Sequence, residues 1–242
     1  MTYSIIIPTL NEEKLLPKLL DILNDEKLKS NYDYEIIISD GGSKDKTLEI
    51  AKSRVNNIIE KPTKEKQNIG MGRNLGADQA NGEILIFFNG DIYPNSMVDI
   101  FNSINNRFIS SKYLAMTCCV EVFPNEQIIT DKIFHSFYNY YFHLLNIIGL
   151  GMGRGECHII KKEIFEEMNG YDERLPAGED FDLFKRIRRK GKILFARNLV
   201  VYESPRRYRK DGHFKILLTW LINSLYIIFT KSAKSKEWEQ VR

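Results

Sequence analysis

The chain has 242 residues, a length suited to one large domain and too long for a scaffold held by disulfides. A hydrophobic content of 43% and a charged content of 28% exclude a disordered, collagen-like or coiled-coil protein. With 35 basic and 32 acidic residues the net charge is only +3, so the composition gives no basis for nucleic-acid binding.

The N-terminal part of the chain alternates between short apolar runs and helical stretches. We expect strands over 3–8, 35–40, 57–60 and 83–88, and helices over 12–23, 44–54 and 68–79. Apolar runs bounded by turn residues are typical of strands buried on both faces, and their alternation with helices indicates a parallel sheet. The sequence therefore predicts an α/β layer fold.

The second half is mixed, with expected strands over 114–123 and 193–202 and expected helices over 161–168 and 180–190. Its three cysteines, Cys118, Cys119 and Cys157, cannot form a disulfide framework. The opening MTYSIIIPTLNEE lacks the basic segment of a signal peptide, which predicts a protein of the reducing cytoplasm. We expect one domain over 1–210, followed by a C-terminal helix and tail over 211–242.

Two segments, 133–150 and 214–230, combine a narrow polar stripe with a wide apolar surface. In the first, the stripe consists of Ser136, Asn139, His143 and Asn146. In the second, it consists of Lys215, Thr219, Asn223, Tyr226 and Thr230. As helices both would be about 26 Å long, which is short of a bilayer core of about 30 Å. Interfacial or re-entrant helices fit better than membrane spans, and ordinary core helices are the alternative.

Basic residues flank the second segment and would favour an anionic cytoplasmic leaflet. They are Arg206, Arg207, Arg209, Lys210, Lys215, Lys231, Lys234 and Lys236. Trp220 suits the headgroup zone of a bilayer. The apolar surface of such a helix would equally suit burial against a second copy of the chain, so a homodimer is the other interpretation.

Polar residues follow three of the expected strands, in the segments 8–12, 40–45 and 89–91. In parallel sheets, ligands bind at the carboxyl ends of the strands. Carboxylates at this edge would suit Mg²⁺ or Mn²⁺, because substrate phosphates and water usually complete the coordination of these ions. Asp91 is the best candidate ligand. The local alternative is that Asn11 and Ser43 cap helices and that Asn89-Gly90 forms a turn.

Two further segments carry charged residues suited to chemistry. Arg73 lies in GMGRNLG (70–76), a glycine-rich helix start whose N–H groups and guanidinium would suit a phosphate. Glu179 and Asp180 follow Gly178 at the start of a basic helix. Their negative charges would interact favourably with the dipole at the N-terminus of that helix, and one of the two carboxylates would also serve as a general base.

In their order along the chain, these segments resemble family 2 glycosyltransferases of the GT-A fold, of the membrane-associated microbial type. The matching segments are SIIIPTLNEE (4–13), EIIISDGGSKDKT (35–47), GRNLGADQANGEILIFFNGD (72–91) and NGYDERLPAGEDFDLFKRIRRKG (169–191). The resemblance implies a Rossmann-like, mostly parallel sheet flanked by helices. One departure is Asn89, which stands where the family usually has an aspartate and weakens the hold on a hard cation.

The resemblance also implies roles for individual residues. Asp180 would be the catalytic base with Glu179 beside it, and Arg206 and Arg207 would contact the diphosphate or the acceptor. Asp91 would bind Mg²⁺ or Mn²⁺, with His213 as a further candidate ligand. The nucleotide sugar would be bound by Pro8, Thr9, Asn11, Glu12, Asp40, Ser43, Arg73, Asn89 and Asp91.

The implied activity is an inverting transfer of a sugar from a nucleoside diphosphate sugar to a membrane-linked acceptor at the cytoplasmic face of the cell membrane. The acceptor would be a lipid-linked glycan or a polyprenyl phosphate. One alternative is a non-catalytic nucleotide-sugar-binding protein of the membrane surface. Another is a sugar-phosphate nucleotidyltransferase, but Thr9-Leu10-Asn11-Glu12 does not match the loop of that class.

Overall fold

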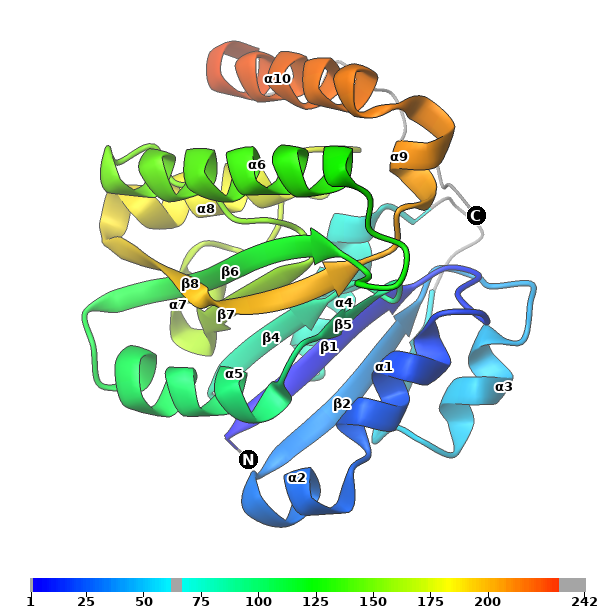
Figure 1. Ribbon diagram of the computed structural model, residues 1–242. Coiled ribbons are helices and arrows are strands. Elements are labelled where there is room, and N and C mark those ends of the chain that lie inside the picture. Colours follow the sequence, from blue (N-terminus) through cyan, green and yellow to red (C-terminus); the bar gives the residue numbers. More distant parts are fainter. Residues whose placement is uncertain (1, 62–66, 231–242) are drawn as a thin grey trace.

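A computed structural model describes residues 2–61 and 67–230, with side chains up to residue 223. Its first half is a parallel sheet in the order β3-β2-β1-β4, formed by β1 (Tyr3–Thr9), β2 (Tyr34–Asp40), β3 (Asn57–Glu60) and β4 (Ile84–Phe88) (Figure 1). The four expected strands are confirmed. Their carboxyl ends lie along one edge of the sheet, which brings the segments after β1, β2 and β4 together.

The second half extends the same sheet in the order β4-β7-β6-β8-β5. Its strands are β5 (Ile92–Pro94), β6 (Tyr113–Val122), β7 (Cys157–Lys161) and β8 (Lys192–Glu203). β7 runs antiparallel to both β4 and β6, β6 and β8 are parallel, and β5 is antiparallel to β8. The sheet as a whole is therefore mixed, and the parallel arrangement applies mainly to the half that the alternating pattern covers. The short strands β5 and β7 were not expected from the sequence.

Helices cover both faces of the sheet because successive strand residues point to opposite sides. Ile5 and Ile7 pack with α1 (Leu16–Leu23), α2 (Glu26–Asn31), α3 (Thr47–Lys52) and α5 (Met97–Ser103), which a π-helical turn, Ile104–Ile109, continues. Ile6 packs on the other face with α4 (Ile69–Asp78), α7 (Lys162–Glu167) and α8 (Glu179–Lys190). The helix expected over 12–23 begins only at Leu16, which leaves Asn11 and Glu12 in the loop at the strand ends.

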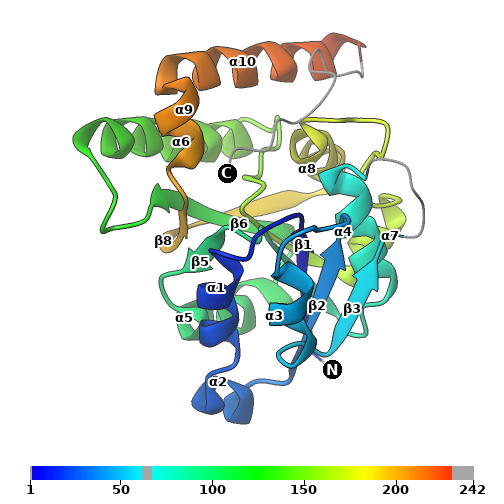
Figure 2. The ribbon, with the colours of Figure 1, turned by 90° about the vertical axis from the view of Figure 1, so that its right-hand side faces the viewer.

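Three helices form a further layer on this framework. α6 (Ile129–Ile147) lies over the sheet, α9 (Arg206–Asp211) follows β8, and α10 (His213–Thr230) lies outside α6 in both views (Figures 1 and 2). Trp220 of α10 contributes to the cluster between these helices, with its ring centroid 5.2 Å from that of Tyr138. The ring of Trp220 is therefore partly buried against α6, and its place in the headgroup zone of a bilayer stays a prediction.

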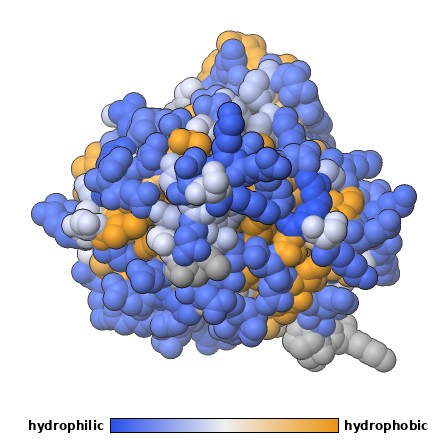
Figure 3. All heavy atoms as spheres, turned by 90° about the horizontal axis from the view of Figure 1, so that it is seen from below, coloured by the Kyte–Doolittle hydropathy of each residue, from blue (hydrophilic) through white to orange (hydrophobic). Residues whose placement is uncertain are grey.

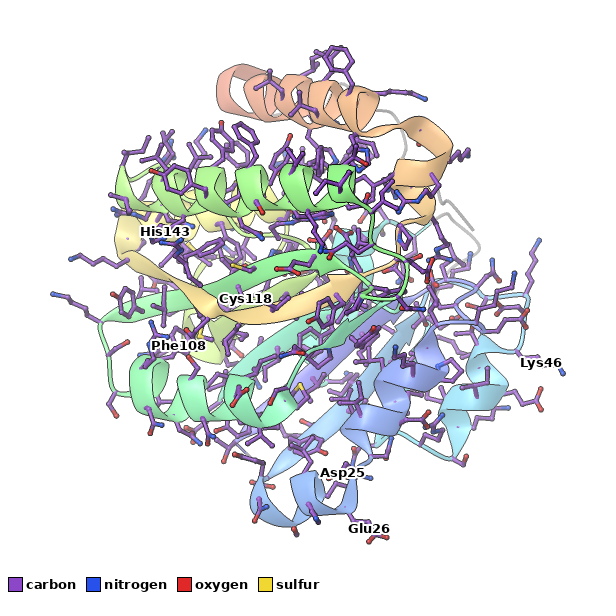
Figure 4. All side chains as sticks on the ribbon, viewed as in Figure 1. Asp25, Glu26, Lys46, Phe108, Cys118 and His143 are labelled. Atoms are coloured by element: carbon purple, nitrogen blue, oxygen red, sulfur yellow. The ribbon has the colours of Figure 1, made fainter. Side chains whose placement is uncertain are left out.

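Three residues of the polar stripe of α6, Asn139, His143 and Asn146, face the protein, whereas Ser136 is exposed. Asn139 accepts a 3.1 Å hydrogen bond from the Val120 N–H and donates a 3.0 Å bond to the Val120 carbonyl, and Asn146 binds the backbone of Met152. His143 lies on the sheet side of the helix, with its ring 5.5 Å from that of Phe195 (Figure 4). Part of the apolar surface of the helix is buried in the core, through side chains such as Phe134 and Phe142, and the rest is exposed.

Large apolar side chains are consequently exposed on α6, the segment after it, and α10. Exposure reaches 69% at Ile129 and 76% at Phe214. We call this set the apolar face: Ile129, Ile133, Phe137, Tyr140, Leu144, Ile147, Ile148, Leu150, Phe214, Leu218 and Leu221. The side of the molecule seen from below is largely hydrophilic (Figure 3). None of the helices in the described part of the chain is long and apolar enough to cross a membrane.

Candidate active site

The loops after β1 and β2 are tied together by side chains. Asp40 is buried and accepts hydrogen bonds from Thr9 Oγ1 at 3.0 Å and from the backbone N–H groups of Gly42 and Ser43 at 2.8 and 2.7 Å. Asn11 has a left-handed backbone with φ of 53°, and its N–H donates to Ser43 Oγ at 2.8 Å. These predicted nucleotide-binding residues therefore also shape the loops in which they lie.

Arg206 brings the start of α9 to the same edge of the sheet. Its Nη2 lies 3.0 Å from Asp91 Oδ2 and 3.1 Å from Glu12 Oε2. Gly90 packs tightly against Glu12, since a Cβ added at Gly90 would lie 3.0 Å from Glu12 Cγ. Two carboxylates from different loops thus converge on one guanidinium.

The positions of Glu12 and Asp91 indicate whether these residues could bind a divalent cation. The part of the chain that the structure describes holds no group of three or more His, Cys, Asp or Glu side chains suited to a metal. Glu12 and Asp91 nevertheless supply hard oxygen donors that already meet at a positive charge, and Mg²⁺ and Mn²⁺ usually take further oxygens from substrate phosphates. The donor chemistry therefore fits a cation shared with a bound diphosphate.

His213 lies in a different environment from Asp91. Its Nε2 is 2.8 Å from Asp131 Oδ1, and its ring stacks on Tyr208 with 5.1 Å between centroids. Burial would raise the pKa of Asp131, but hydrogen bonds from Arg209, the Ile128 N–H and His213 lower it to about 2. His213 is held by this contact with Asp131, so the structure does not support it as a metal ligand.

Arg73 is the most deeply buried charge of the predicted set, with 1% exposure of its side chain. Its Nη1 donates to Glu179 Oε1 at 2.7 Å, and its Nη2 donates to Asn89 Oδ1 at 3.0 Å and to the Gly155 carbonyl at 2.7 Å. The Arg73 Nε is buried without a hydrogen-bond partner among the described residues.

The glycines around Arg73 serve close packing. A Cβ at Gly76 would lie 2.4 Å from Ile6 Cγ2, so α4 approaches β1 only because this side chain is absent. The helix start is capped by Asn68, whose Oδ1 accepts the Met71 N–H at 2.8 Å. The glycine-rich segment thus positions Arg73, and its role as a phosphate cradle stays a prediction.

Asp180 lies beside this buried pair at the start of α8, after Gly178, which has a left-handed φ of 77°. Its Oδ1 accepts the Phe181 N–H at 2.7 Å. Burial and the negative charge of Glu179 raise the pKa of Asp180 to about 7, although Arg73 opposes this shift. A carboxyl with a pKa near 7 is well suited to act as a general base.

A second network of charged residues, which the sequence did not indicate, adjoins the site, and its members Arg154 and Glu156 line the cavity described below. Arg154 Nη2 donates to Glu203 Oε1 at 2.8 Å and its Nε to Glu156 Oε2 at 3.2 Å, and the Tyr208 hydroxyl donates to Glu203 at 2.7 Å. Burial and the charge of Glu156 raise the pKa of Glu203 to about 8, while burial and Arg154 lower the pKa of His135 to about 3. These residues belong to no sequence motif. The only sequence feature that could have identified them is the presence of charged residues within apolar segments.

A cavity of about 370 Å³ joins several of these residues. Its polar lining includes Arg73, Asn89, Glu156, Glu179 and Asp180, and its apolar lining comes largely from α6 and α10. Pro8, Thr9, Asn11, Glu12, Asp40, Ser43, Asp91, Arg206 and Arg207 lie outside this lining. Asn89 and Asp91 are two residues apart, so the cavity adjoins the loops at the strand ends.

Comparison with known proteins gives one family over most of the chain. The model of the family described as Glycosyl transferase family 2 matches residues 4–168. Among curated proteins, the chain is 43% identical over 96 residues to the dolichyl N-acetyl-alpha-D-glucosaminyl phosphate 3-beta-D-2,3-diacetamido-2,3-dideoxy-beta-D-glucuronosyltransferase of Methanococcus voltae. That match covers 38% of this chain and 29% of the relative, so the chain corresponds to well under half of that protein.

Solved structures with the same fold include two nucleotide-sugar complexes. The mannosyltransferase PcManGT from Pyrobaculum calidifontis, in complex with GDP-Man and Mn²⁺, gives a TM-score of 0.67 at 19% identity, covering 89% of this chain and 64% of that one. TarS 1-349 of S. aureus, in complex with UDP-GlcNAc, gives a TM-score of 0.61 at 17% identity. The match covers 96% of this chain and 74% of the TarS chain. The GT-A fold expected from the sequence is confirmed.

Proposed function

This chain belongs to glycosyl transferase family 2, and we propose on that basis that it is an inverting glycosyltransferase that moves a sugar from a nucleoside diphosphate sugar to a membrane-linked acceptor. The observation that carries the proposal is the position of Asp180. It is a partly buried carboxyl with a pKa raised to about 7, beside the Arg73–Glu179 pair and at a cavity large enough for a ligand.

The donor is proposed to bind in the loops at the carboxyl ends of β1, β2 and β4. Solved relatives of the same fold hold GDP-Man with Mn²⁺ and UDP-GlcNAc, which supports a nucleotide-sugar donor. Asp91, with Glu12 close to it, would hold Mg²⁺ or Mn²⁺ against the diphosphate. The metal would supply positive charge as the diphosphate leaves.

In the proposed reaction, an acceptor oxygen attacks the anomeric carbon from the side opposite the diphosphate. The bond between that carbon and the diphosphate oxygen breaks, and the diphosphate leaves with the electron pair. When the acceptor group is a hydroxyl, its proton passes to Asp180. Arg73 and Arg206 would stabilise the growing negative charge of the diphosphate, and the single displacement inverts the anomeric configuration.

The membrane-linked acceptor is supported by the apolar face and by the name of the Methanococcus voltae relative, which places a dolichyl phosphate in its substrate. Insertion of this face into the headgroup region would hold the site near a lipid-linked substrate. We propose the cytoplasmic face of the cell membrane as its location. The predicted basic residues Lys231, Lys234 and Lys236 lie outside the described residues, so the structure leaves their contribution untested.

A screen of UDP-, GDP- and dTDP-sugars tests the proposal, first by thermal stabilisation and then by release of the nucleoside diphosphate with lipid-linked acceptors. A donor present at 100 times its Kd should raise the free energy of unfolding by about 2.7 kcal/mol. Stabilisation together with acceptor-dependent release is expected. Stabilisation without any release would favour the non-catalytic nucleotide-sugar-binding alternative.

A further inference from the structure

The cavity beside Asp180 has two chemically different walls. Between α6 and α10 it is lined by aromatic and aliphatic side chains, including Tyr138, Phe142, Leu217 and Trp220. The rest of the lining, which we call the charged wall, carries Asp180 and the other charged residues of the site. A cavity with this division suits a ligand that has an apolar body and one reacting polar end.

The apolar wall continues to the surface of the molecule. Phe137 and Leu221 both line the cavity, and their side chains are 58% and 47% exposed. They also belong to the apolar face, so the cavity and that face are continuous. A chain embedded among lipids would reach Asp180 along this route without crossing a polar surface.

The charged wall carries more negative than positive groups. Its carboxylates are Glu156, Glu179 and Asp180, and its guanidinium groups are Arg73 and Arg154. Each guanidinium already contacts a carboxylate, Arg73 with Glu179 at 2.7 Å and Arg154 with Glu156 at 3.2 Å. Arg73 would be shared with the diphosphate of the donor, so an acceptor phosphate beside Asp180 would meet like charge, whereas a neutral hydroxyl would find an acceptor for its proton.

We propose that this cavity binds the apolar chain of the acceptor and that the reacting group of that acceptor is a neutral hydroxyl rather than a phosphate. The inference rests on the proposed glycosyl transfer and narrows its acceptor class. The oxygen of the hydroxyl would attack the anomeric carbon, and its proton would pass to Asp180. A phosphate acceptor would need no base, so the experiment must distinguish binding of a hydroxyl acceptor from binding of a phosphate acceptor.

Intrinsic fluorescence of Trp220 provides a direct readout. The chain has two tryptophans, so Trp238→Phe leaves Trp220, in the cavity wall, as the single probe. Farnesol and farnesyl phosphate are titrated into this variant without membranes. Farnesol is expected to change the emission saturably, and to bind at least about tenfold more tightly than farnesyl phosphate, a difference of about 1.4 kcal/mol.

Substitutions in the same background test the location. Leu217→Asp places a charge in the apolar wall and is expected to weaken farnesol binding about tenfold or more, because it buries an uncompensated carboxylate. Val98→Asp, at an exposed apolar residue of α5 outside the lining, is the matched control and should bind as the parent does. Leu217→Phe, which narrows the cavity without charge, should also weaken binding and covers the case that Leu217→Asp does not fold.

Thermal stabilisation by the sugar donor, measured on each variant, shows whether the fold and the donor site are intact. If the donor stabilises the protein and farnesol produces no saturable change, the cavity proposal is wrong while the proposed function stands. Equal or tighter binding of farnesyl phosphate, or unchanged binding by both Leu217 variants, would also overturn it. If no donor stabilises the protein, the proposed function itself fails.

Discussion

Arg73 Nη1 donates a 2.7 Å hydrogen bond to Glu179 Oε1, and the two side chains are only 1% and 8% exposed. The bond joins α4 to the first turn of α8, immediately before Asp180. A buried ion pair of this kind contributes little net stability, but loss of one partner leaves a buried charge uncompensated. The pair therefore determines where the Asp180 backbone lies relative to the cavity.

Replacement of Glu179 by Gln should destabilise the protein because Arg73 would lose its hydrogen-bonded counterion and keep only the nearby carboxyl of Asp180. We expect the free energy of unfolding to fall by about 3 kcal/mol, and Tm by roughly 6 °C or more in a thermal melt. The matched control is Glu166→Gln, which removes an exposed pair with Lys162 at 3.9 Å and should change Tm little. An equal Tm for wild type and Glu179→Gln would contradict this assignment.

Asp180→Asn should abolish transfer to a hydroxyl acceptor, because the amide cannot accept the proton. We expect a loss of at least about 10²-fold in turnover with donor stabilisation unchanged. Asp182→Asn, which removes the neighbouring pair with Arg186 on the same helix, is the control and should retain most activity. Turnover of Asp180→Asn at the wild-type level would remove Asp180 from the mechanism.

The pH dependence follows from the raised pKa of Asp180, which is about 7. The base acts when ionised, so kcat/KM should fall about tenfold for each pH unit below 7 and level off above it. Stability should change in the opposite direction, because a carboxyl with a folded-state pKa above its unfolded value of about 3.9 favours folding when protonated. Asp180→Asn should thus have a higher Tm than wild type at pH 8, and a lower Tm would argue against burial of the charge.

Arg206 holds Glu12 and Asp91 together through contacts of 3.1 and 3.0 Å. Arg206→Ala should remove the guanidinium that lies between two neighbouring carboxylates and so increase the affinity for Mn²⁺ in the absence of donor, measured by calorimetry. Activity should fall, since the guanidinium would no longer stabilise the leaving diphosphate. Weaker Mn²⁺ binding than in wild type would show that the two carboxylates do not share a cation site.

Ile133→Asp combined with Phe214→Asp places charge on the apolar face, at side chains that are 64% and 76% exposed. If this face enters the headgroup region, wild type should sediment with anionic liposomes and the double variant should remain in solution. Val98→Asp is the control. If wild type instead stays in solution and forms a dimer that the double variant lacks, the face is an interface between two copies.

Local sequence pattern was enough to predict the first four strands, the helix that carries Arg73 and the helix start that carries Asp180. Each of these depends on local pattern, such as the apolar run 84–88 or the glycine that precedes Glu179. Local pattern is sufficient there because strands buried on both faces and glycine-led turns have composition signals of their own.

Which distant residues contact one another depends on the three-dimensional fold and could not be predicted from the sequence. Arg206 and Asp91 are 115 positions apart, and no spacing along the chain indicates their contact. Periodicity identified the polar stripe of α6 but could not show that it faces β6, because an amphipathic pattern distinguishes two faces without saying which one is covered. Strands β5 and β7 were missed because short strands acquire their stability from partners across the sheet, and those partners come from other parts of the chain.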